Sequence, residues 1–260
     1  MEFADTSDPT RRFSNRVANY AAARPGYPDE IVAVLAERGM LPPEGTIADI
    51  GSGTGISSEL FLRHGFSVIG VEPNREMREA AESSLGGYGS AFQSVDGRAE
   101  ATGLPDGSVD GIVAGQAFHW FEPQGTRREF ARIATPGSPL MLIWNTRRTD
   151  GTRFLEEYER LLLRHGTDYA TVRHTRIDSA ALVPMFEAGS FSRFTLPNEQ
   201  KLDLAGLRAR LLSSSYVPPL DDPRSAPMLE ELAALFERHQ RGGVVYILYD
   251  TEIHAGRVRF

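Results

Sequence analysis

Residues 47–60, IADIGSGTGISSEL, constrain this chain more than any other stretch. An apolar run with one acid, Asp49, is followed by Gly51, Gly53 and Gly55 at alternate positions and then by a helical pattern. Glycine has no Cβ and tolerates left-handed backbone, so this spacing indicates a tight turn that another group approaches closely. A buried strand that turns through glycines into a helix is where open α/β sheets bind nucleotide-like ligands, because the turn and the helix N-terminus present N–H groups.

The glycine spacing separates two ligand classes. A dinucleotide fingerprint is G-x-G-x-x-G, whereas this chain has G-x-G-x-G and places Ile56 where the third dinucleotide glycine would fall. Glu72 ends the next apolar run, residues 66–71, roughly 20 residues downstream, where a second-strand acid binds ribose hydroxyls. Asp49, the glycines and Glu72 together resemble the S-adenosylmethionine (SAM) site of class I methyltransferases. An NAD(P)-dependent oxidoreductase and a turn without a ligand remain the alternatives.

Strand and helix patterns alternate up to residue 144. After the first strand, apolar strand-like runs lie at residues 66–71, 91–95, 109–114 and 140–144. Helical patterns of about a dozen residues separate them, which predicts βαβ units and a parallel sheet. Right-handed crossovers place the carboxyl ends of such strands on one edge, so we expect the ligand crevice at that edge.

The composition excludes several kinds of site and partner. The 260 residues include no cysteine, which excludes disulfides, thiolate metal sites and cysteine nucleophiles. A formal net charge of −7 disfavours nucleic acid, no apolar run approaches the ~18 residues of a membrane-spanning helix, and no metal-binding motif is present. The polar, acidic start differs from a signal peptide. We therefore expect a cytoplasmic monomer or homodimer that acts on a small molecule and binds no nucleic acid, membrane or metal.

The patterns predict three parts of the chain. Residues 1–148 are expected to contain N-terminal helices and the SAM-binding, Rossmann-like half. Residues 149–190 carry a strongly amphipathic helix and are expected to form a helical lid over the crevice. Residues 191–260, with strand patterns at 191–196 and 244–254, are expected to complete the sheet and the substrate pocket.

Further motifs occur in a characteristic order. They are YAAARPGYP at residues 20–28, GSGTG at 51–55, Glu72-Pro73, GRAE at 97–100 and AFHWF at 117–121. In this order they look like the type 11 SAM-dependent methyltransferases and are similar to the branch that includes trans-aconitate methyltransferases. The resemblance covers roughly residues 13–148 and is specific to the cofactor rather than to an acceptor. It implies a Rossmann-like α/β fold with a mostly parallel seven-stranded sheet, helices on both faces and a helical lid. It also implies SAM as the cofactor and S-adenosylhomocysteine (SAH) as the product.

The resemblance assigns cofactor-binding roles by position. The residues concerned are Asp49, Gly51, Gly53, Gly55, Glu72, Pro73, Ala99, Glu100, Gln116, Tyr20 and Arg24. The glycines would let the backbone approach the methionine part, with Asp49 near its amino group. Glu72 would accept bonds from the ribose hydroxyls, and Gln116 would present its backbone to the methionine end.

The remaining positions concern the adenine and the closure of the site. Ala99 and Glu100 would border the adenine, while Tyr20 and Arg24 would close over the ligand. The family often has aspartate where this chain has Arg98, and an arginine cannot accept a bond from the adenine amino group. We therefore expect Arg98 to point outward and Glu100, or another group, to make that contact.

Methyl transfer from a sulfonium is a displacement on carbon for which the cofactor carries the activated group, so the protein mainly orients the reactants. His119 is the candidate general base for an acceptor that must lose a proton, whereas a carboxylate acceptor needs none. The predicted substrate-binding residues are His119, Trp120, Asn145 and Arg147, since an arginine at the crevice can pair with an anion. Packing by His119 and solvation of Arg147 remain open, as does a SAM-fold protein that binds its ligand without turnover.

Overall fold

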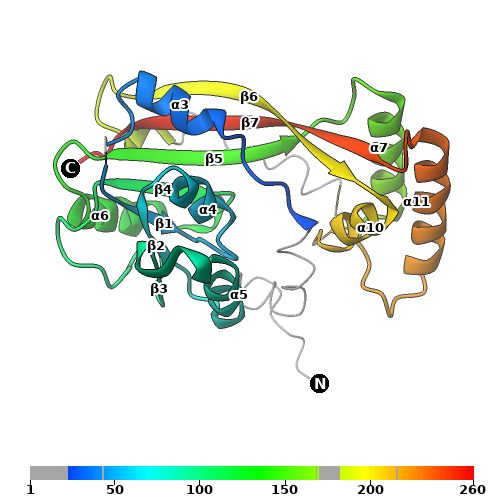
Figure 1. Ribbon diagram of the computed structural model, residues 1–260, viewed down its shortest axis with the longest axis horizontal. Helices are drawn as coiled ribbons and strands as arrows, with labels where there is room; N and C mark the ends of the chain where they lie inside the picture. The colour runs from blue at the N-terminus through cyan, green and yellow to red at the C-terminus, as the bar shows by residue number, and fades with distance from the viewer. Residues whose placement is uncertain (1–22, 43, 168, 170–181, 215) are drawn as a thin grey trace.

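The centre of the molecule is a seven-stranded sheet with the strand order β3-β2-β1-β4-β5-β7-β6 (Figure 1). The computed structural model describes residues 23–42, 44–167, 169, 182–214 and 216–260. The strands are β1 Thr46–Ile50, β2 Ser67–Val71, β3 Phe92–Val95, β4 Gly111–Gly115, β5 Pro139–Arg147, β6 Ser192–Leu202 and β7 Val245–Arg257. Each strand predicted from the sequence is present, and β6 and β7 are longer than their apolar patterns.

Strands β1 to β5 form the parallel part of the sheet. β1 lies between β2 and β4, with Ala48 opposite Ile69 on one side and Ile112 on the other. β3 extends the sheet beyond β2, and β5 extends it beyond β4. Because all five run in the same direction, their carboxyl ends meet at one edge, as predicted.

The last two strands run differently. β7 pairs antiparallel with β5 on one side and antiparallel with β6 on the other. A dinucleotide-binding Rossmann sheet has the order 3-2-1-4-5-6 without a reversed strand between the fifth and sixth. The inserted, antiparallel β7 therefore favours the methyltransferase form of the fold over the oxidoreductase alternative.

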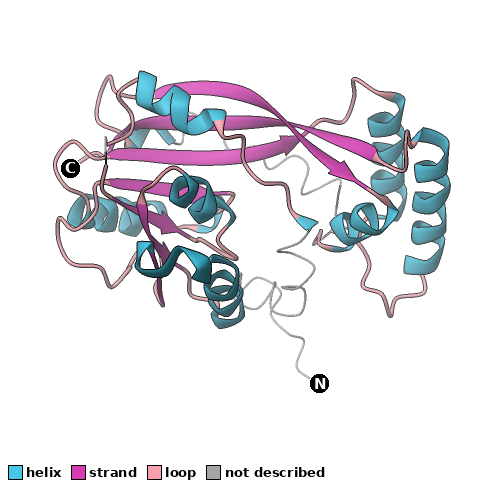
Figure 2. Ribbon diagram, viewed as in Figure 1, coloured by secondary structure: helices cyan, strands magenta, loops and turns pink. Residues whose placement is uncertain are grey.

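Helices cover both faces of the sheet, as Figure 2 shows. They are α3 Glu30–Glu37, α4 Ile56–Arg63, α5 Arg75–Leu85, α6 Pro123–Ile133, α7 Arg153–His165, α10 Leu204–Leu212 and α11 Ser225–His239, with short 3-10 turns η2 Gly86–Ala91, η3 Phe118–Trp120 and η4 Val183–Met185. α3 and α4 pack with Ile47 and Val113 in one apolar cluster. α6 packs with Ile50 and Ile112 in another. The alternation of side chains along β1 thus divides its residues between two cores.

A third cluster forms away from these two faces. α7, α10 and α11 gather at one end of the long strands β6 and β7 (Figure 1), where Leu155, Leu207 and Leu232 share a core with Ile247 and Tyr249 of β7. Asp203 accepts a bond from the N–H of Gly206 at 2.7 Å and so caps the start of α10. We refer to α7, α10 and α11 together as the helical unit.

The helical unit differs in its boundaries from the helical lid that was predicted at residues 149–190. Of the described residues in that range, α7 packs with α10 and α11, which belong to the next predicted part. Leu182, Met185 and Phe186 instead pack in the cluster of α6. Residues 168 and 170–181 lie outside the described part of the chain.

No helix among the described residues is long and apolar enough to cross a membrane. α11, with 15 residues, is the longest of the helices described. A membrane-spanning helix needs about 20 mostly apolar residues.

Candidate functional site

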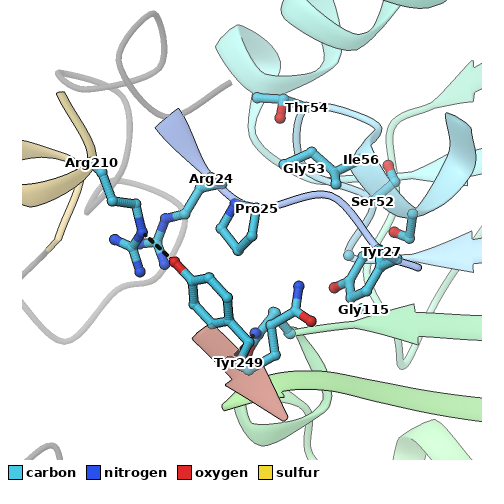
Figure 3. A pocket seen from close by; sticks show the side chains of 14 residues that line it. Arg24, Pro25, Tyr27, Ser52, Gly53, Thr54, Ile56, Gly115, Arg210 and Tyr249 are labelled. Carbon is cyan, nitrogen blue, oxygen red and sulfur yellow. Dashed lines mark hydrogen bonds between the residues drawn. The ribbon is translucent and has the colours of Figure 1, made fainter. Parts of the chain in front are cut away.

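A cavity opens at the carboxyl edge of the parallel strands. It encloses about 550 Å³, counting the space open to solvent. The glycine-rich turn after β1 forms one wall, and the segment with Arg24 and Tyr27 lies beside it (Figure 3). Arg210 of α10 and Tyr249 of β7 contribute from the opposite direction. The crevice predicted from the strand order is therefore present, and the helical unit supplies part of its lining.

The three glycines of the turn all have left-handed backbone, a conformation that favours glycine over other residues. Their φ angles are 69° at Gly51, 55° at Gly53 and 86° at Gly55. A Cβ at Gly51 would lie 2.6 Å from the Cβ of Ala117, and one at Gly55 would lie 2.6 Å from Cδ1 of Leu85. A Cβ at Gly53 would meet no atom within 4 Å. Gly51 and Gly55 thus serve packing, whereas Gly53 borders open space in the cavity.

Asp49 lies at the end of β1 beneath the turn and is fully buried. Its Oδ2 accepts bonds from the hydroxyls of Ser57 and Ser58, both at 2.7 Å, while its Oδ1 has no partner among the described residues. Burial raises the pKa of Asp49 to about 6; the two serine bonds lower it, and the charge of Glu72 raises it. A cationic group above the turn would satisfy this carboxylate.

Glu72 follows β2 and faces the same turn. Its Oε2 accepts from the N–H of Gly53 at 3.1 Å, and its Oε1 accepts from the N–H of Asn74 at 2.9 Å. Burial raises the pKa of Glu72, and these two N–H groups oppose the shift. Each oxygen keeps a second lone pair, because a carboxylate accepts about four hydrogen bonds. Glu72 can therefore organise the turn and still accept bonds from a diol.

The fit of a SAM-like cofactor can be judged from atoms that lack partners. The Oγ1 of Thr54 is buried, lines the cavity and has no hydrogen-bond partner in the described residues. The Oδ1 of Asp49 is also buried and has no partner among the described residues, although Asp49 lies behind the turn and does not line the cavity. These atoms and the open space at Gly53 surround the turn where a nucleotide-like ligand would bind. The residues present fit the group.

Gln116 directly follows β4, and Asn145 lies near the carboxyl end of β5. Gln116 has φ = 58°, a left-handed value that is rare outside glycine. Its Nε2 donates to the backbone oxygen of Asn145 at 3.0 Å. The Asn145 amide donates to the backbone oxygen of Gly26 at 3.1 Å and accepts from Thr251 at 2.6 Å. Both residues line the cavity, and Asn145 also fixes the adjoining segment of residues 24–27.

The predicted adenine border is more mixed. Ala99 is 4% exposed and packs in the cluster of α6. Glu100 accepts from the N–H of Glu122 at 2.7 Å, so one of its oxygens is engaged near the start of α6. Arg98 is exposed, in agreement with the expectation that it points outward. Pro73 is half-buried beside Glu72.

Two of the predicted substrate residues do not line this cavity. His119 and Trp120 are exposed on η3 and contact each other, with ring centroids 4.8 Å apart. Neither residue belongs to the lining. The structure therefore gives His119 no position as a general base for this cavity.

Arg147 is also placed differently from the prediction. Its guanidinium pairs with Glu159 of α7, donates to the Tyr169 hydroxyl at 2.7 Å and lies over the ring of Tyr158. It is largely buried inside the helical unit and does not line the cavity. The prediction of a substrate-binding Arg147 is wrong for this cavity, because a strand-end position does not reveal a partner on the following helix.

Tyr20 lies outside the described residues, whereas Arg24 lines the cavity and donates to the backbone oxygen of Ser213 at 3.2 Å. Sequence reasoning missed Arg210 and Tyr249, which join Arg24 at that wall. Both lie in regular elements far from the recognised motifs. The apolar period of α10 could have marked Arg210 as a charged residue beside the buried Leu207 and Leu211.

Comparisons with known proteins agree with this geometry. Residues 48–142 match the family model of the type 11 methyltransferase domain. An uncharacterised methyltransferase-like protein of Schizosaccharomyces pombe is 27% identical over 248 residues, which is 93% of each chain. An uncharacterised methyltransferase of Mycobacterium tuberculosis is 34% identical over 141 residues, and the match spans about half of each chain, 54%. None of these relatives tests the trans-aconitate branch, which remains a prediction.

Solved structures show the same fold. A protein described as a type II methyltransferase from Anaeromyxobacter dehalogenans superimposes with a TM-score of 0.68 and 23% identity, covering 90% of this chain and 97% of that one. Phosphoethanolamine N-methyltransferase 2 of Haemonchus contortus superimposes with a TM-score of 0.54 and 13% identity, covering 100% of this chain and 60% of that one. With the strand order and the domain match, these likenesses identify the fold class. The chain therefore has the class I methyltransferase fold, and its residues 48–142 match the type 11 methyltransferase domain.

Proposed function

We propose that the protein transfers a methyl group from SAM to a small-molecule acceptor, and that the methylated group of this acceptor is a carboxylate. The observation that supports SAM as the cofactor is the geometry of the glycine-rich turn. Gly53 borders open space, Glu72 accepts its N–H, and the buried Oδ1 of Asp49 lacks a partner. The Haemonchus contortus methyltransferase of the same fold was solved with S-adenosylhomocysteine, which supports the same cofactor class here.

Each residue of the turn has a defined task in this proposal. Gly53 lets the backbone approach the methionine part, Gly51 and Gly55 hold the turn in the required left-handed conformation, and Asp49 stabilises the ammonium group of the ligand. Glu72 binds the ribose hydroxyls, and the strained backbone of Gln116 borders the reacting end. When bound, SAM supplies a methyl group already activated on a sulfonium. The protein contributes orientation and exclusion of water, which can lower a barrier by roughly 7–11 kcal/mol.

The absence of a base supports a carboxylate acceptor. Among the described residues that line the cavity there is no histidine, aspartate or glutamate. The polar side chains present are hydroxyls, the amides of Gln116 and Asn145, and the guanidiniums of Arg24 and Arg210. A carboxylate is ionised at neutral pH and needs no base to become nucleophilic. An alcohol acceptor, in contrast, must lose its proton to become a good nucleophile.

Calorimetry with purified protein tests the cofactor. We expect SAM and SAH to bind and NADH to give no heat. Glu72→Ala should weaken SAH binding about 100-fold, because it removes the ribose partner and leaves the Gly53 and Asn74 N–H groups without an acceptor. The matched control is Glu79→Ala, which removes an exposed glutamate of α5 and should leave binding intact.

The alternatives predict other results. NADH binding without a response to SAM or SAH would contradict the proposal and favour the oxidoreductase. SAM binding without transfer of labelled methyl to any carboxylic acid in a screen would favour a ligand-binding protein or another acceptor. A cytoplasmic location and a monomeric or homodimeric state remain predictions.

A further inference from the structure

The cavity wall opposite the glycine-rich turn contains a buried cation. Arg210 is 6% exposed, and no carboxylate lies within ion-pair distance of it among the described residues. Its Nε donates to the Tyr249 hydroxyl at 3.2 Å, and its Nη1 donates to the hydroxyls of Ser213 and Ser214 at 3.4 and 3.1 Å. No described residue supplies an acceptor for Nη2. The guanidinium is thus held in place by neutral hydroxyls only.

A second guanidinium approaches the same serine. Arg24 donates to the backbone oxygen of Ser213, whose side chain accepts from Arg210. Arg24 and Arg210 both line the cavity (Figure 3). Two like charges close together are unfavourable unless negative charge lies near them. The end of α10 supplies only the partial negative charge of a helix C-terminus.

The pKa of the neighbouring Tyr216 is shifted in the direction that this arrangement of charges requires. Burial alone raises the pKa of its phenol, yet the net shift is downward because Arg210, a hydrogen bond with Ser214, Arg147 and Arg24 all favour the phenolate. Arg147 is already paired with Glu159. Arg210 makes the largest of the contributions that lower the pKa of Tyr216, and it has no carboxylate partner among the described residues.

Burying a cation without an anion costs several kcal/mol, so such a group is retained where a ligand completes it. Guanidinium groups bind carboxylate and phosphate oxygens through parallel N–H bonds, and Nη2 offers such a donor here. Resting on the proposed function, we propose that Arg210 is the specificity-determining residue for the acceptor and binds an anionic carboxylate or phosphate group at the end remote from the methylated atom. The acceptor then carries at least two polar ends, one at Arg210 and one at the methyl donor.

The test measures cofactor and acceptor binding separately on the full chain. SAH is titrated first by calorimetry, and the SAH complex is then titrated with glutarate, its neutral analogue glutaramide, and inorganic phosphate. We expect glutarate or phosphate to bind and glutaramide to fail. Glutarate alone binding would identify a carboxylate subsite, and phosphate alone a phosphate subsite. In Arg210→Gln the anion affinity should fall about 10- to 100-fold while the SAH affinity stays within about threefold.

The matched control is Arg208→Gln, which removes an exposed arginine from the same helix and should leave anion binding intact. A second measurement needs no variant: at constant ionic strength, the bound anion should raise the Tm of the wild-type SAH complex, whereas glutaramide should not. These two readouts keep the test valid even if Arg210→Gln folds poorly.

Several outcomes would overturn the assignment. Equal anion binding by wild type and Arg210→Gln would do so, as would no binding of glutarate and phosphate by a wild type that binds SAH. Loss of SAH binding in Arg210→Gln, with retained binding of 5′-methylthioadenosine, would assign Arg210 to the carboxylate of the cofactor instead. A wild type that binds no SAH would contradict the proposed function itself, and the two failures are thus distinguishable.

Discussion

The two walls of the cavity are built in different ways. The glycine-rich wall consists of a backbone turn with left-handed glycines, and two acids behind it, Asp49 and Glu72, bind groups of the turn and of the helix that follows it. The opposite wall consists of side chains from α10 and β7, Arg210 and Tyr249, which are 39 residues apart. The first wall depends on local geometry and the second on tertiary packing. The proposed cofactor-binding chemistry thus lies in a local motif, while the proposed acceptor selection depends on residues that only the fold brings together.

Two buried arginines differ in the same way. Arg147, at the end of β5, packs against the helical unit, and Arg210 belongs to α10 of that unit. Arg147 has a carboxylate partner in Glu159, and both side chains are at most one tenth exposed. Among the described residues Arg210 has only hydroxyl partners, and it faces the cavity. We interpret Arg147 as part of the packing of α7 and Arg210 as part of the site. The predictions below test these assignments, starting with the largest expected effect.

Arg147→Met should lower the free energy of unfolding by about 3–5 kcal/mol, because it leaves the buried charge of Glu159 without its cation. Urea unfolding followed by circular dichroism measures this. The control is Arg148→Met, which breaks an ion pair with Asp250 whose side chains are 42% and 39% exposed. An exposed pair contributes at most about 1 kcal/mol. Equal stability of the two variants would contradict a structural role of Arg147.

Asp49→Asn should raise the free energy of unfolding at pH 7 by up to about 3 kcal/mol. The pKa of Asp49 rises from 3.8 to about 6 on folding, and each unit is about 1.4 kcal/mol. Because its pKa is higher in the folded state, protonated Asp49 stabilises the fold fully below pH 3.8, and this contribution is lost as the pH increases through about 6. The difference between variant and wild type should therefore grow between pH 4 and pH 6 in urea titrations.

The same variant should bind SAH more weakly, since the neutral amide lacks the charge that the ammonium group of the ligand requires. Asp221→Asn, at an exposed position, is the control for loss of an aspartate. A pH-independent stability difference for Asp49→Asn would show that Asp49 does not titrate in this range. Increased stability together with reduced binding would mean that the buried charge of Asp49 lowers the stability of the fold and is needed for ligand binding.

Gly53→Ala should have the smallest effect on stability, about 1–2 kcal/mol, which is the cost of a left-handed backbone in a non-glycine residue. It should also weaken SAH binding, because the new methyl group occupies open space at the cavity. Gly65→Ala is a matched control: its φ is 87° and a Cβ there would likewise meet nothing within 4 Å. If both variants bind SAH like wild type, the ligand does not approach the turn at Gly53.

The sequence by itself determined the central fold and one half of the site. Alternating apolar strands and amphipathic helices predicted the parallel sheet, since each pattern has one periodicity that buries its apolar side chains. The glycine spacing with Asp49 and Glu72 predicted the turn, because positive φ and close backbone approach are local requirements that few residues other than glycine satisfy.

Only the tertiary structure decided the other half. A charged residue in an amphipathic pattern looks the same whether its partner is solvent, a carboxylate or an empty cavity. Arg147 ends a strand and Arg210 lies within a helix, and neither position in the sequence reveals that the first pairs with Glu159 and the second faces the site. Their partners come from elements that meet only because β6 and β7 extend past the parallel strands and pack with the helical unit at that end. Such long-range packing has no local sequence pattern, and it places Arg210, the residue proposed to select the acceptor, at the cavity.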